Sequence, residues 1–327
     1  MSLIGHLRFA RFYKNRIAIN HDDPPAQESP AADPIALLES LSARLERAEA
    51  LIGRIAGDLR FEQYRIEAAL FHTEGLTPLR EEFLKARSTA EYQAAFDNDN
   101  PLVSVCVTTM NRAELLVERA LASICAQSYR NLQVIVVGDH CTDDTADRIA
   151  RLGDSRISFV NLPKRGPYPR SGNDQPGNDR WRVAGTYPGN RALALVEGEF
   201  VTHLDEDDTF EPQRIEILLQ KIREVRADLV FHPFWYQQPD GGWVECGNGS
   251  FELTQTGTGM IFYHRYLARV PWDVYAYRFG EPGDWNRLRK IKMMRARIEF
   301  VPLPLTRYYR LPARDPFVAE EGEQFLD

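Results

Sequence analysis

The apolar positions near the N-terminus are spaced alternately three and four residues apart. This spacing joins seven residues: Leu38, Leu41, Leu45, Ala48, Ile52, Ile55 and Leu59. It is the a/d pattern of a coiled coil over about three heptads, with Arg and Glu between the apolar positions. Two interpretations stay open: a homo-oligomer formed through residues 35–70, or a helix that packs on its own chain. Gly53 and Gly57 each weaken this helix by about 1 kcal/mol relative to alanine.

The pattern changes after a turn cluster at residues 97–101. From there, short apolar runs alternate with amphipathic stretches. The runs predict strands over 102–108, 132–137, 157–162, 199–204 and 229–236, and the stretches predict helices over 113–127, 142–152, 188–196 and 212–226. This alternation predicts an α/β fold with a mainly parallel, Rossmann-like sheet flanked by helices. Ligands of such sheets bind at the carboxyl ends of the strands.

The two patterns divide the chain into three parts. A basic N-terminal segment and a Pro-rich linker occupy 1–34, a helical extension occupies 35–98, and the α/β domain occupies 99–327. Residues 1–20 carry four basic side chains and no acidic one, interleaved with apolar residues. This composition suits a helix on a membrane surface, and the alternative is a terminus that packs on its own protein.

Composition narrows the class of protein. The 327 residues include 40 Lys and Arg against 47 Asp and Glu, a net charge of −7, which argues against nucleic acid as the partner. No apolar run reaches the length of a membrane span, and the N-terminus has no signal-peptide core. The four cysteines lack metal-binding spacing and suit a reducing compartment. We therefore expect a cytoplasmic protein, located at the inner face of the membrane if the basic segment binds lipid.

A run of four acids, residues 205–208, follows the predicted strand 199–204. Asp205, Glu206, Asp207 and Asp208 repel one another unless a cation neutralises them. Mg²⁺ and Mn²⁺ prefer oxygen ligands, and Mg²⁺ commonly uses one or two carboxylates together with substrate phosphates. The alternative is a solvated acidic turn in which Asp208 or Thr209 caps the next helix.

Other strand ends also carry polar side chains. The first strand is followed by residues suited to contact a base or ribose: Thr108, Thr109, Met110, Asn111 and Arg112. Asn111 has the alternative role of a helix cap. Asp139, after the second strand, can accept hydrogen bonds from a base or a ribose. The long loop 163–187 contains four arginines, Arg180 among them, that suit a diphosphate or a solvated surface insertion.

Asp284 stands at the start of a later predicted helix. An acidic residue there is often an N-cap. The functional alternative is a general base that accepts the proton of a hydroxyl group.

Taken in order, these segments resemble the inverting family 2 glycosyltransferases with the GT-A fold. Six stretches between residues 101 and 310 carry the resemblance: VSVCVTTMNR (103–112), VVGDHCTDDT (136–145), PGNRA (188–192), GEFVTHLDEDD (198–208), GTGM (257–260) and GDW (283–285). Four positions depart from the family pattern, namely Met110, Gly138, His140 and Gly283. The processive Gln-x-x-Arg-Trp motif is absent from the sequence, which favours an enzyme that adds a single sugar.

The resemblance implies a site and a reaction. Asp207, helped by Asp205, would hold Mn²⁺ or Mg²⁺ on the diphosphate of a nucleotide-sugar, with a UDP-sugar favoured, and Asp284 would be the base. The residues implied to bind the nucleotide-sugar are Thr108, Thr109, Met110, Asn111, Arg112, Asp139, Arg180, Asp205 and Glu206. The acceptor would be a saccharide, a lipid-linked molecule or a protein, in the synthesis of bacterial surface polysaccharide or glycoconjugate.

Two other classes of function remain as alternatives. A nucleotidyltransferase also uses an α/β sheet and paired acids, but it usually has a Gly-rich, basic phosphate loop after the first strand, and residues 108–112 do not form one. A non-catalytic scaffold on a degenerate transferase fold would suit the N-terminal heptads. The acids at 139, 205, 207 and 284 argue against the scaffold.

Overall fold

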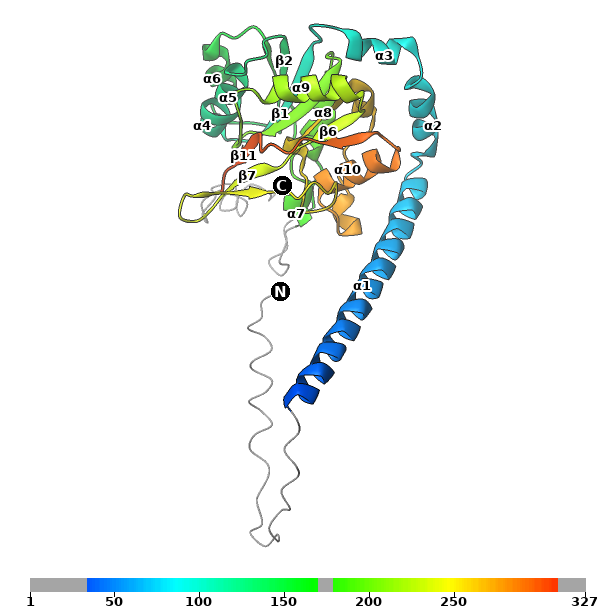
Figure 1. The fold of residues 1–327 in the computed structure, drawn as a ribbon. Helices are drawn as coiled ribbons and strands as arrows, with labels where there is room; N and C mark the ends of the chain where they lie inside the picture. Colours follow the sequence, from blue (N-terminus) through cyan, green and yellow to red (C-terminus); the bar gives the residue numbers. More distant parts are fainter. Residues whose placement is uncertain (1–33, 170–178, 311–327) are drawn as a thin grey trace, which may run out of the picture. The chain divides into compact units, whose positions relative to one another are not determined.

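The computed structural model describes residues 34–169 and 179–310 (Figure 1). The chain divides into two compact units, Met1–Tyr64 and Arg65–Asp327. The expected basic segment 1–20 and most of the linker lie outside the described residues. Helix α1 (Pro34–Thr73) is a single helix of 40 residues. Within the described ranges, no helix combines the length and the apolarity needed to span a bilayer.

Two short helices connect α1 to the sheet. Helices α2 (Thr77–Ala86) and α3 (Ala90–Asp97) belong to the second compact unit. The hydroxyl oxygen of Thr89 caps α3 by accepting a hydrogen bond from the amide of Tyr92 (3.3 Å). The Tyr92 hydroxyl in turn donates to the fully buried carboxylate of Asp228 at 2.7 Å, and Arg87 pairs with the same carboxylate at 3.0 Å. These polar contacts fasten α2 and α3 to the sheet.

The central sheet has seven strands. In spatial order they are β10 (Ile298–Phe300), β6 (Leu229–Phe231), β9 (Ile261–His264), β4 (Phe200–Asp205), β1 (Val103–Thr109), β2 (Leu132–Gly138) and β3 (Ile157–Asn161). Strand β9 is antiparallel to both of its neighbours, and the other pairs are parallel. The predicted mainly parallel α/β sheet is therefore confirmed. Its inner strands are nearly all apolar because both faces of a parallel sheet are buried.

Helices cover the sheet (Figure 1). They are α4 (Ala113–Leu115), the π-helical segment η2 (Leu116–Leu121), α5 (Ala122–Cys125), α6 (Thr145–Leu152), α7 (Asp179–Val183), α8 (Thr186–Leu193), α9 (Arg214–Val225) and α10 (Gly283–Met293). Short 3₁₀ turns complete the unit: η3 (Thr258–Met260), η4 (Arg265–Arg269) and η5 (Ala276–Phe279). The predicted helix 113–127 thus contains a π-helical turn, which the apolar spacing alone did not indicate.

The prediction of one strand over 229–236 is wrong. The chain leaves the central sheet after β6 and enters a second sheet of four strands, ordered β5 (Thr209–Phe210), β11 (Thr306–Tyr308), β7 (Phe234–Gln237) and β8 (Trp243–Cys246). The break falls at His232 and Pro233. Proline has no amide hydrogen to donate to a strand neighbour, so it does not continue a central strand.

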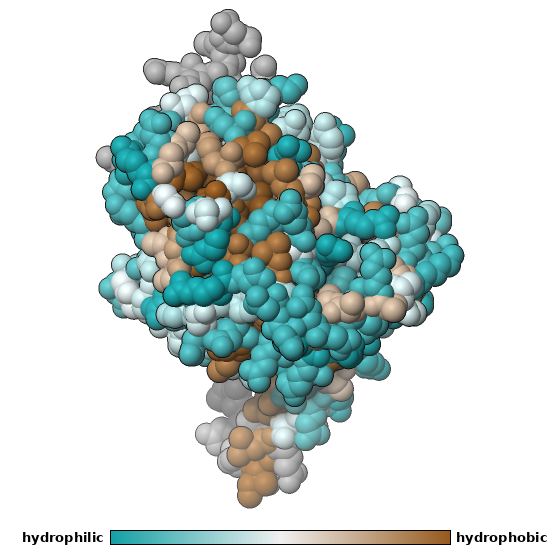
Figure 2. Space-filling model, turned by 90° about the horizontal axis from the view of Figure 1, so that it is seen from above, coloured by the Kyte–Doolittle hydropathy of each residue, from teal (hydrophilic) through white to brown (hydrophobic). Residues whose placement is uncertain are grey.

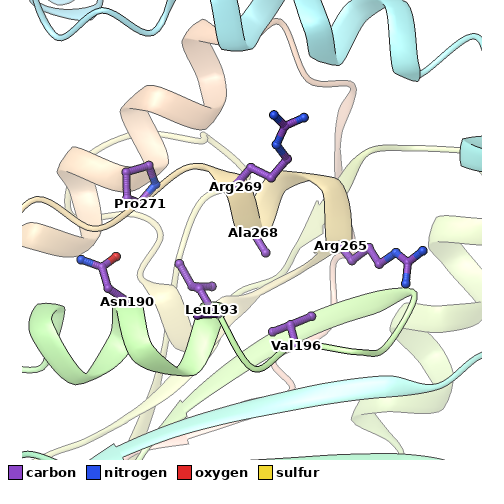
Figure 3. A pocket seen from close by; sticks show the side chains of 8 residues that line it. Asn190, Leu193, Val196, Arg265, Ala268, Arg269 and Pro271 are labelled. Carbon is purple, nitrogen blue, oxygen red and sulfur yellow. The ribbon is translucent and has the colours of Figure 1, made fainter.

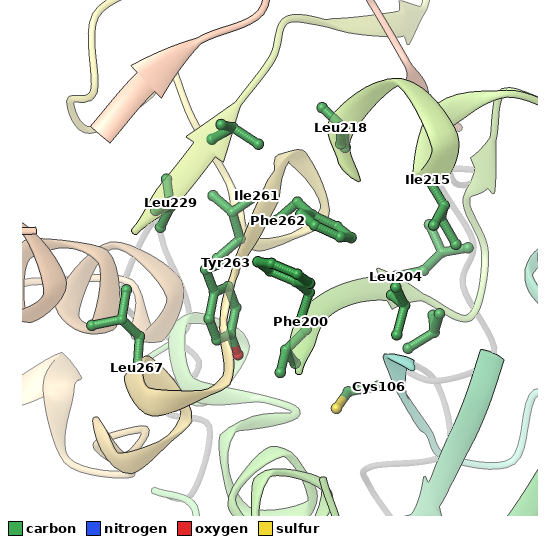
Figure 4. Close-up of a cluster of buried hydrophobic side chains, with 14 of the residues drawn as sticks. Cys106, Phe200, Leu204, Ile215, Leu218, Leu229, Ile261, Phe262, Tyr263 and Leu267 are labelled. Atoms are coloured by element: carbon green, nitrogen blue, oxygen red, sulfur yellow. The ribbon is translucent and has the colours of Figure 1, made fainter. Parts of the chain in front are cut away.

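The core of the second unit lies around the central sheet. Figure 4 shows side chains from β4, β9 and α9 meeting in one apolar cluster, in which the rings of Phe200 and Phe262 stack 5.6 Å apart. Both rings are fully buried. The face of the structure drawn in Figure 2 is mostly hydrophilic, with a large group of apolar residues in its upper half and smaller groups elsewhere. Burial of this kind holds the strand ends in fixed positions for the site.

Candidate active site

The strand order creates a switch point between β1 and β4. The two strands are parallel neighbours, and Thr108 lies beside Asp205 in their register. The chain after β1 moves toward β2, on one side, whereas β4 lies on the other side. Loops that leave such neighbours in opposite directions open a crevice at the carboxyl edge of the sheet, which is where ligands of open α/β sheets bind.

The acidic turn after β4 is held by arginines from the β1 side. The guanidinium of Arg112 pairs with Asp207 at 3.0 Å and with Glu206 at 3.5 Å. Arg119, on η2, donates to the backbone carbonyl of Asp207 at 2.9 Å. Arg112 is therefore brought to the acidic turn, as the resemblance implied for the site, but in this structure its partners are carboxylates.

Crowding of like charges shifts the proton affinities of this turn. Burial, followed by the charges of Asp207 and Asp284, raises the pKa of Asp205 to about 7, although the residue still reaches solvent. Burial and the charge of Asp207 raise the pKa of Glu206 to about 8. These carboxyl groups titrate as an interacting set. A nearby cation would lower their pKa values.

The alternative role of Asp208 as a helix cap is wrong. Asp208 is 3% exposed, and its carboxylate accepts the backbone amide of Tyr309 at 2.9 Å. Helix α9 begins six residues later, after Gln213, with no side-chain cap. Burial, together with the neighbouring acids, raises the pKa of Asp208 well above its usual range. Asp208 thus joins the acidic turn to the strand β11.

Asp284, on helix α10, lies near the acidic turn and faces the same crevice. It lies in the first turn of α10, whose N-cap is Pro282, so the N-cap alternative for Asp284 is not met. Its carboxylate accepts the amide of Trp285 at 3.0 Å, and burial raises its pKa. A Cβ atom built on Gly257 would lie 3.7 Å from its other oxygen, Oδ2. The loop at Gly257 therefore closes directly over this carboxylate.

A buried arginine fixes that loop. Arg214 is fully buried, and its guanidinium donates to the carbonyl of Gly259 (3.0 Å), the hydroxyl of Thr202 (2.9 Å) and the ring of His232 (3.0 Å). Burial lowers its pKa well below the usual range. The guanidinium spans β4, the end of β6 and η3, so it sets the position of η3 relative to the sheet.

A second group of polar side chains lies around Asp139, at the end of β2. Asp139 is 4% exposed and accepts the amide of Gly166 at 3.0 Å. Burial raises its pKa, while Tyr168, Gly166, Arg165 and Arg180 oppose the shift. The loop after β3 and helix α7 thus bring Arg165 and Arg180 near Asp139. Arg170 lies outside the described residues.

The residues after β1 differ in burial and in their hydrogen-bond partners. Thr108 faces the backbone of Gly185, Thr109 is buried with no hydrogen-bond partner for its hydroxyl within the described residues, and Met110 is half-buried. Asn111 has a left-handed backbone (φ 51°), and its side-chain carbonyl accepts the amide of Thr142 at 2.8 Å. The expected helix-capping role of Asn111 is therefore wrong, because this side chain joins the β1 loop to the β2 loop.

Packing explains why residue 138 is a glycine and not the acidic residue of the family pattern. A Cβ atom on Gly138 would come within 2.7 Å of the Asn161 carbonyl oxygen and 2.9 Å of the Cys141 sulfur. Asn161 itself accepts the amide of Cys141 and donates to its carbonyl, both at 2.8 Å. Asn161 occupies the space that an acidic side chain at 138 would need.

Sequence reasoning missed several residues of the crevice. Tyr308 on β11 lies so close to the acidic turn and Asp284 that their charges, after burial, raise its pKa. Thr258, on η3, has a buried hydroxyl with no partner among the described residues. Tyr168 is a third, beside Asp139. Thr258 lies in the stretch GTGM and Tyr168 in the loop 163–187, but neither side chain had a predicted role, and no motif marks Tyr308.

The side chains present fit a divalent cation only with help from a ligand. The acidic turn supplies carboxylates whose mutual repulsion favours a cation. Within the two described ranges, however, no three His, Cys, Asp or Glu side chains are grouped closely enough to cage a metal ion. One or two carboxylates completed by phosphate oxygens match the usual habit of Mg²⁺.

A separate cavity of about 460 Å³ lies between α8 and η4 (Figure 3). Its lining is Asn190, Leu193, Ala194, Val196, Arg265, Ala268, Arg269 and Pro271. Of the two arginines at this cavity, Arg265 donates to the carbonyl of Glu197 at 3.3 Å and Arg269 pairs with Glu82 at 2.7 Å. None of the predicted site residues lines this cavity.

Comparison with known proteins gives concordant matches. Residues 104–169 match the sequence model of Glycosyl transferase family 2. An Escherichia coli protein named, provisionally, as the colanic acid biosynthesis glycosyl transferase WcaA is 30% identical over 189 residues, 56% of this chain and 60% of that protein. The GalNAc(5)-diNAcBac-PP-undecaprenol beta-1,3-glucosyltransferase of Campylobacter jejuni is 36% identical over 128 residues, 38% of this chain and 35% of that protein.

Among solved structures, S. aureus TarS 1–349 superposes with a TM-score of 0.49 and 20% identity, over 63% of this chain and 60% of that chain. The chain covers less than two thirds of the length of each of these proteins. The family match over residues 104–169 contains nearly all of β1, the segment between β1 and β2, and Asp139. The family match over residues 104–169, the two named relatives and the mainly parallel sheet support a family 2 glycosyltransferase of GT-A type.

Proposed function

We propose that the protein transfers a sugar from a nucleotide-diphosphate donor to an acceptor hydroxyl, with inversion at the anomeric carbon. The observation that carries this proposal is the meeting of Asp284 and the acidic turn in one crevice, close enough for Asp284 to raise the pKa of Asp205. A base on one element and a charge-binding turn on another are the two parts that such a displacement needs.

Each side chain has a distinct task in this proposal. Asp139, with Arg165 and Arg180 nearby, binds the nucleoside end of the donor. Asp284 accepts the proton of the acceptor hydroxyl, whose oxygen then forms the bond to the anomeric carbon as the bond to the donor diphosphate breaks. The pKa of Asp284, raised by burial, makes it a better proton acceptor than a carboxylate in water.

Asp207 and Asp205 would hold Mn²⁺ or Mg²⁺ together with the donor diphosphate. The ion would supply positive charge to the leaving nucleotide. Arg112 pairs with both Glu206 and Asp207, so its guanidinium neutralises part of the negative charge of this turn. Metal-dependent binding therefore remains part of the proposal, and it is open to direct measurement.

The substrates follow from the relatives only as proposals. The Escherichia coli relative is named for colanic acid biosynthesis, and the Campylobacter jejuni relative for a lipid-linked saccharide and glucosyl transfer. We propose a saccharide acceptor, lipid-linked or free, in bacterial surface polysaccharide synthesis, with a protein acceptor as the third choice. A UDP-sugar is the favoured donor.

Nucleotide binding tests the proposal directly. Titrations of UDP and GDP, with and without Mn²⁺, are expected to show metal-dependent binding of one of them, and Asp207→Asn is expected to weaken it at least tenfold. Asp240→Asn, at an exposed turn between β7 and β8, is the matched control and should bind as the wild type does. Binding that does not depend on metal, in both wild type and variant, would remove the metal from the proposal. Absence of any nucleotide binding would favour a scaffold.

The raised pKa values predict a pH dependence. Asp205 and Glu206 take up protons at about pH 7 and 8 in the folded protein, above their values in an unfolded chain. The folded state then binds more protons than the unfolded state between about pH 4 and 8, so the free energy of unfolding falls as pH rises through this window. Mn²⁺ needs the deprotonated ligands.

We therefore expect Mn²⁺ with UDP to raise the melting temperature by several degrees more at pH 8 than at pH 5.5, relative to UDP alone. Differential scanning fluorimetry at the two pH values measures this difference. The Asp207→Asn variant should lose most of it. Equal stabilisation at both pH values would contradict the role assigned to these carboxylates.

A further inference from the structure

The apolar heptad stripe of helix α1 is exposed to solvent. The four a positions are more than half exposed: Leu38 at 66%, Leu45 at 61%, Ile52 at 65% and Leu59 at 65%. At the d positions, Leu41 and Ile55 are 48% and 49% exposed. All of these positions lie on α1, which is a single continuous helix (Figure 1).

A long helix with an exposed apolar stripe needs a packing partner for most of its stability. Most of the stability of protein helices comes from packing an apolar face, and isolated helices in water are marginal. The stripe follows the a and d positions, with Ile35 and Leu51 as exposed apolar residues beside it, whereas a helix that covers a globular core usually has a wider apolar face. A narrow 3.5-residue seam fits another helix.

The charges on α1 favour a partner that resembles α1 itself. Residues 38–59 contain four acidic and three basic side chains. A helix that lies on an anionic membrane is usually rich in Lys and Arg on its polar face, and this one is balanced. A balanced, self-complementary surface suits a second copy of the same helix.

We propose that α1 pairs with α1 of a second copy in a parallel, in-register, two-stranded coiled coil. In this arrangement a g position lies beside the e position of the next heptad on the partner helix. With Leu45 at a, Arg44 is at g and Glu49 at the following e position, so each Arg44 faces a Glu49 of the other copy. Leu51 and Ala56 form the next g–e pair, which is apolar.

The glycines of α1 agree with this register. Gly53 falls at position b and Gly57 at position f, both on the side away from the seam. A Cβ atom added at either glycine would meet nothing within 4 Å. The residues that weaken the helix are therefore placed where they leave the contact surface intact, and they provide positions for control variants.

The mass of the full chain in solution tests the pairing. Light scattering coupled to size exclusion is expected to give twice 37.5 kDa for the wild type. Leu45→Lys combined with Ile52→Lys should give the monomer mass with an unchanged circular dichroism signal from the second unit. Gly57→Ala should remain dimeric. A monomeric wild type, whether its stripe is covered by residues 1–33 or by nothing, would overturn the proposal.

An exchange of charges tests whether the two α1 helices are parallel. Arg44→Glu should raise the dissociation constant of the dimer on the order of tenfold, since both g–e pairs become repulsive. Adding Glu49→Arg should restore wild-type affinity in a parallel pair. Leu45→Cys should form an intermolecular disulfide under mild oxidation, and Gly57→Cys should not. A dimer in which the second charge change gives no rescue and Leu45→Cys does not cross-link would refute the parallel register.

Discussion

Replacement of Asp284 by Asn is expected to lower the rate of sugar transfer about 10²- to 10⁴-fold, the usual contribution of a positioned general base. The Asn side chain keeps an oxygen that can accept the amide of Trp285, so the first turn of α10 is retained. It cannot take up the proton of the acceptor hydroxyl. Steady-state transfer, measured once the donor sugar has been found in a nucleotide-sugar screen, gives the size of the effect.

Binding separates a catalytic effect from a structural one. The Asp284→Asn variant should still bind the nucleotide, because the side chains of Asp139 and of the acidic turn are all retained. Asp240→Asn, on the exposed turn after β7, should transfer sugar at the wild-type rate. A wild-type rate for Asp284→Asn would take the role of base away from this residue.

Replacement of Asp228 by Ala is expected to lower the free energy of unfolding by about 3 to 5 kcal/mol. Asp228 is fully buried and accepts the Tyr92 hydroxyl at 2.7 Å and the backbone amide of Arg297 at 2.7 Å, besides pairing with Arg87. Its removal leaves buried donors without an acceptor and the Arg87 charge without its partner. Urea unfolding followed by tryptophan fluorescence measures the change.

An exposed ion pair provides the control. Asp99 is fully exposed and pairs with Arg223 at 3.2 Å, so Asp99→Ala should change the free energy of unfolding by less than about 1 kcal/mol. If Asp228→Ala were as mild as Asp99→Ala, helices α2 and α3 would not depend on this carboxylate for their attachment. A large loss would show that residues from α2 onward fold together with the sheet.

The sequence predicted the structure best where apolar runs mark the strands and polar residues follow their ends. The apolar runs predicted the strands β1, β2, β3 and β4 to within one or two residues. Strands β1, β2 and β4 are buried on both faces, which leaves little choice of side chain. The order of these strands then indicated which loops share an edge. Arg112, Asp205 and Asp207 follow strand ends at that edge, whereas Asp284 was singled out by its place before a helix and by the resemblance.

What the sequence could not predict depends on contacts between distant segments. The partner of Asp208 is the amide of Tyr309, 101 residues away, and no local pattern marks such a pair. The π-helical turn η2 and the break at Pro233 come from packing and from a missing donor, and both override the apolar period. Asn111 looked like a cap because Asn often is one, but its partner belongs to another loop.

The ion pair between Arg112 and Asp207 has a consequence for the order of events at the site. The guanidinium and a divalent cation would compete for the same carboxylate, so the cation alone must displace an internal counter-charge. A diphosphate offers the released guanidinium a new set of oxygens. At the proposed metal site, exchange of Arg112 would link binding of the cation to binding of the nucleotide, and each would strengthen the other by the same factor.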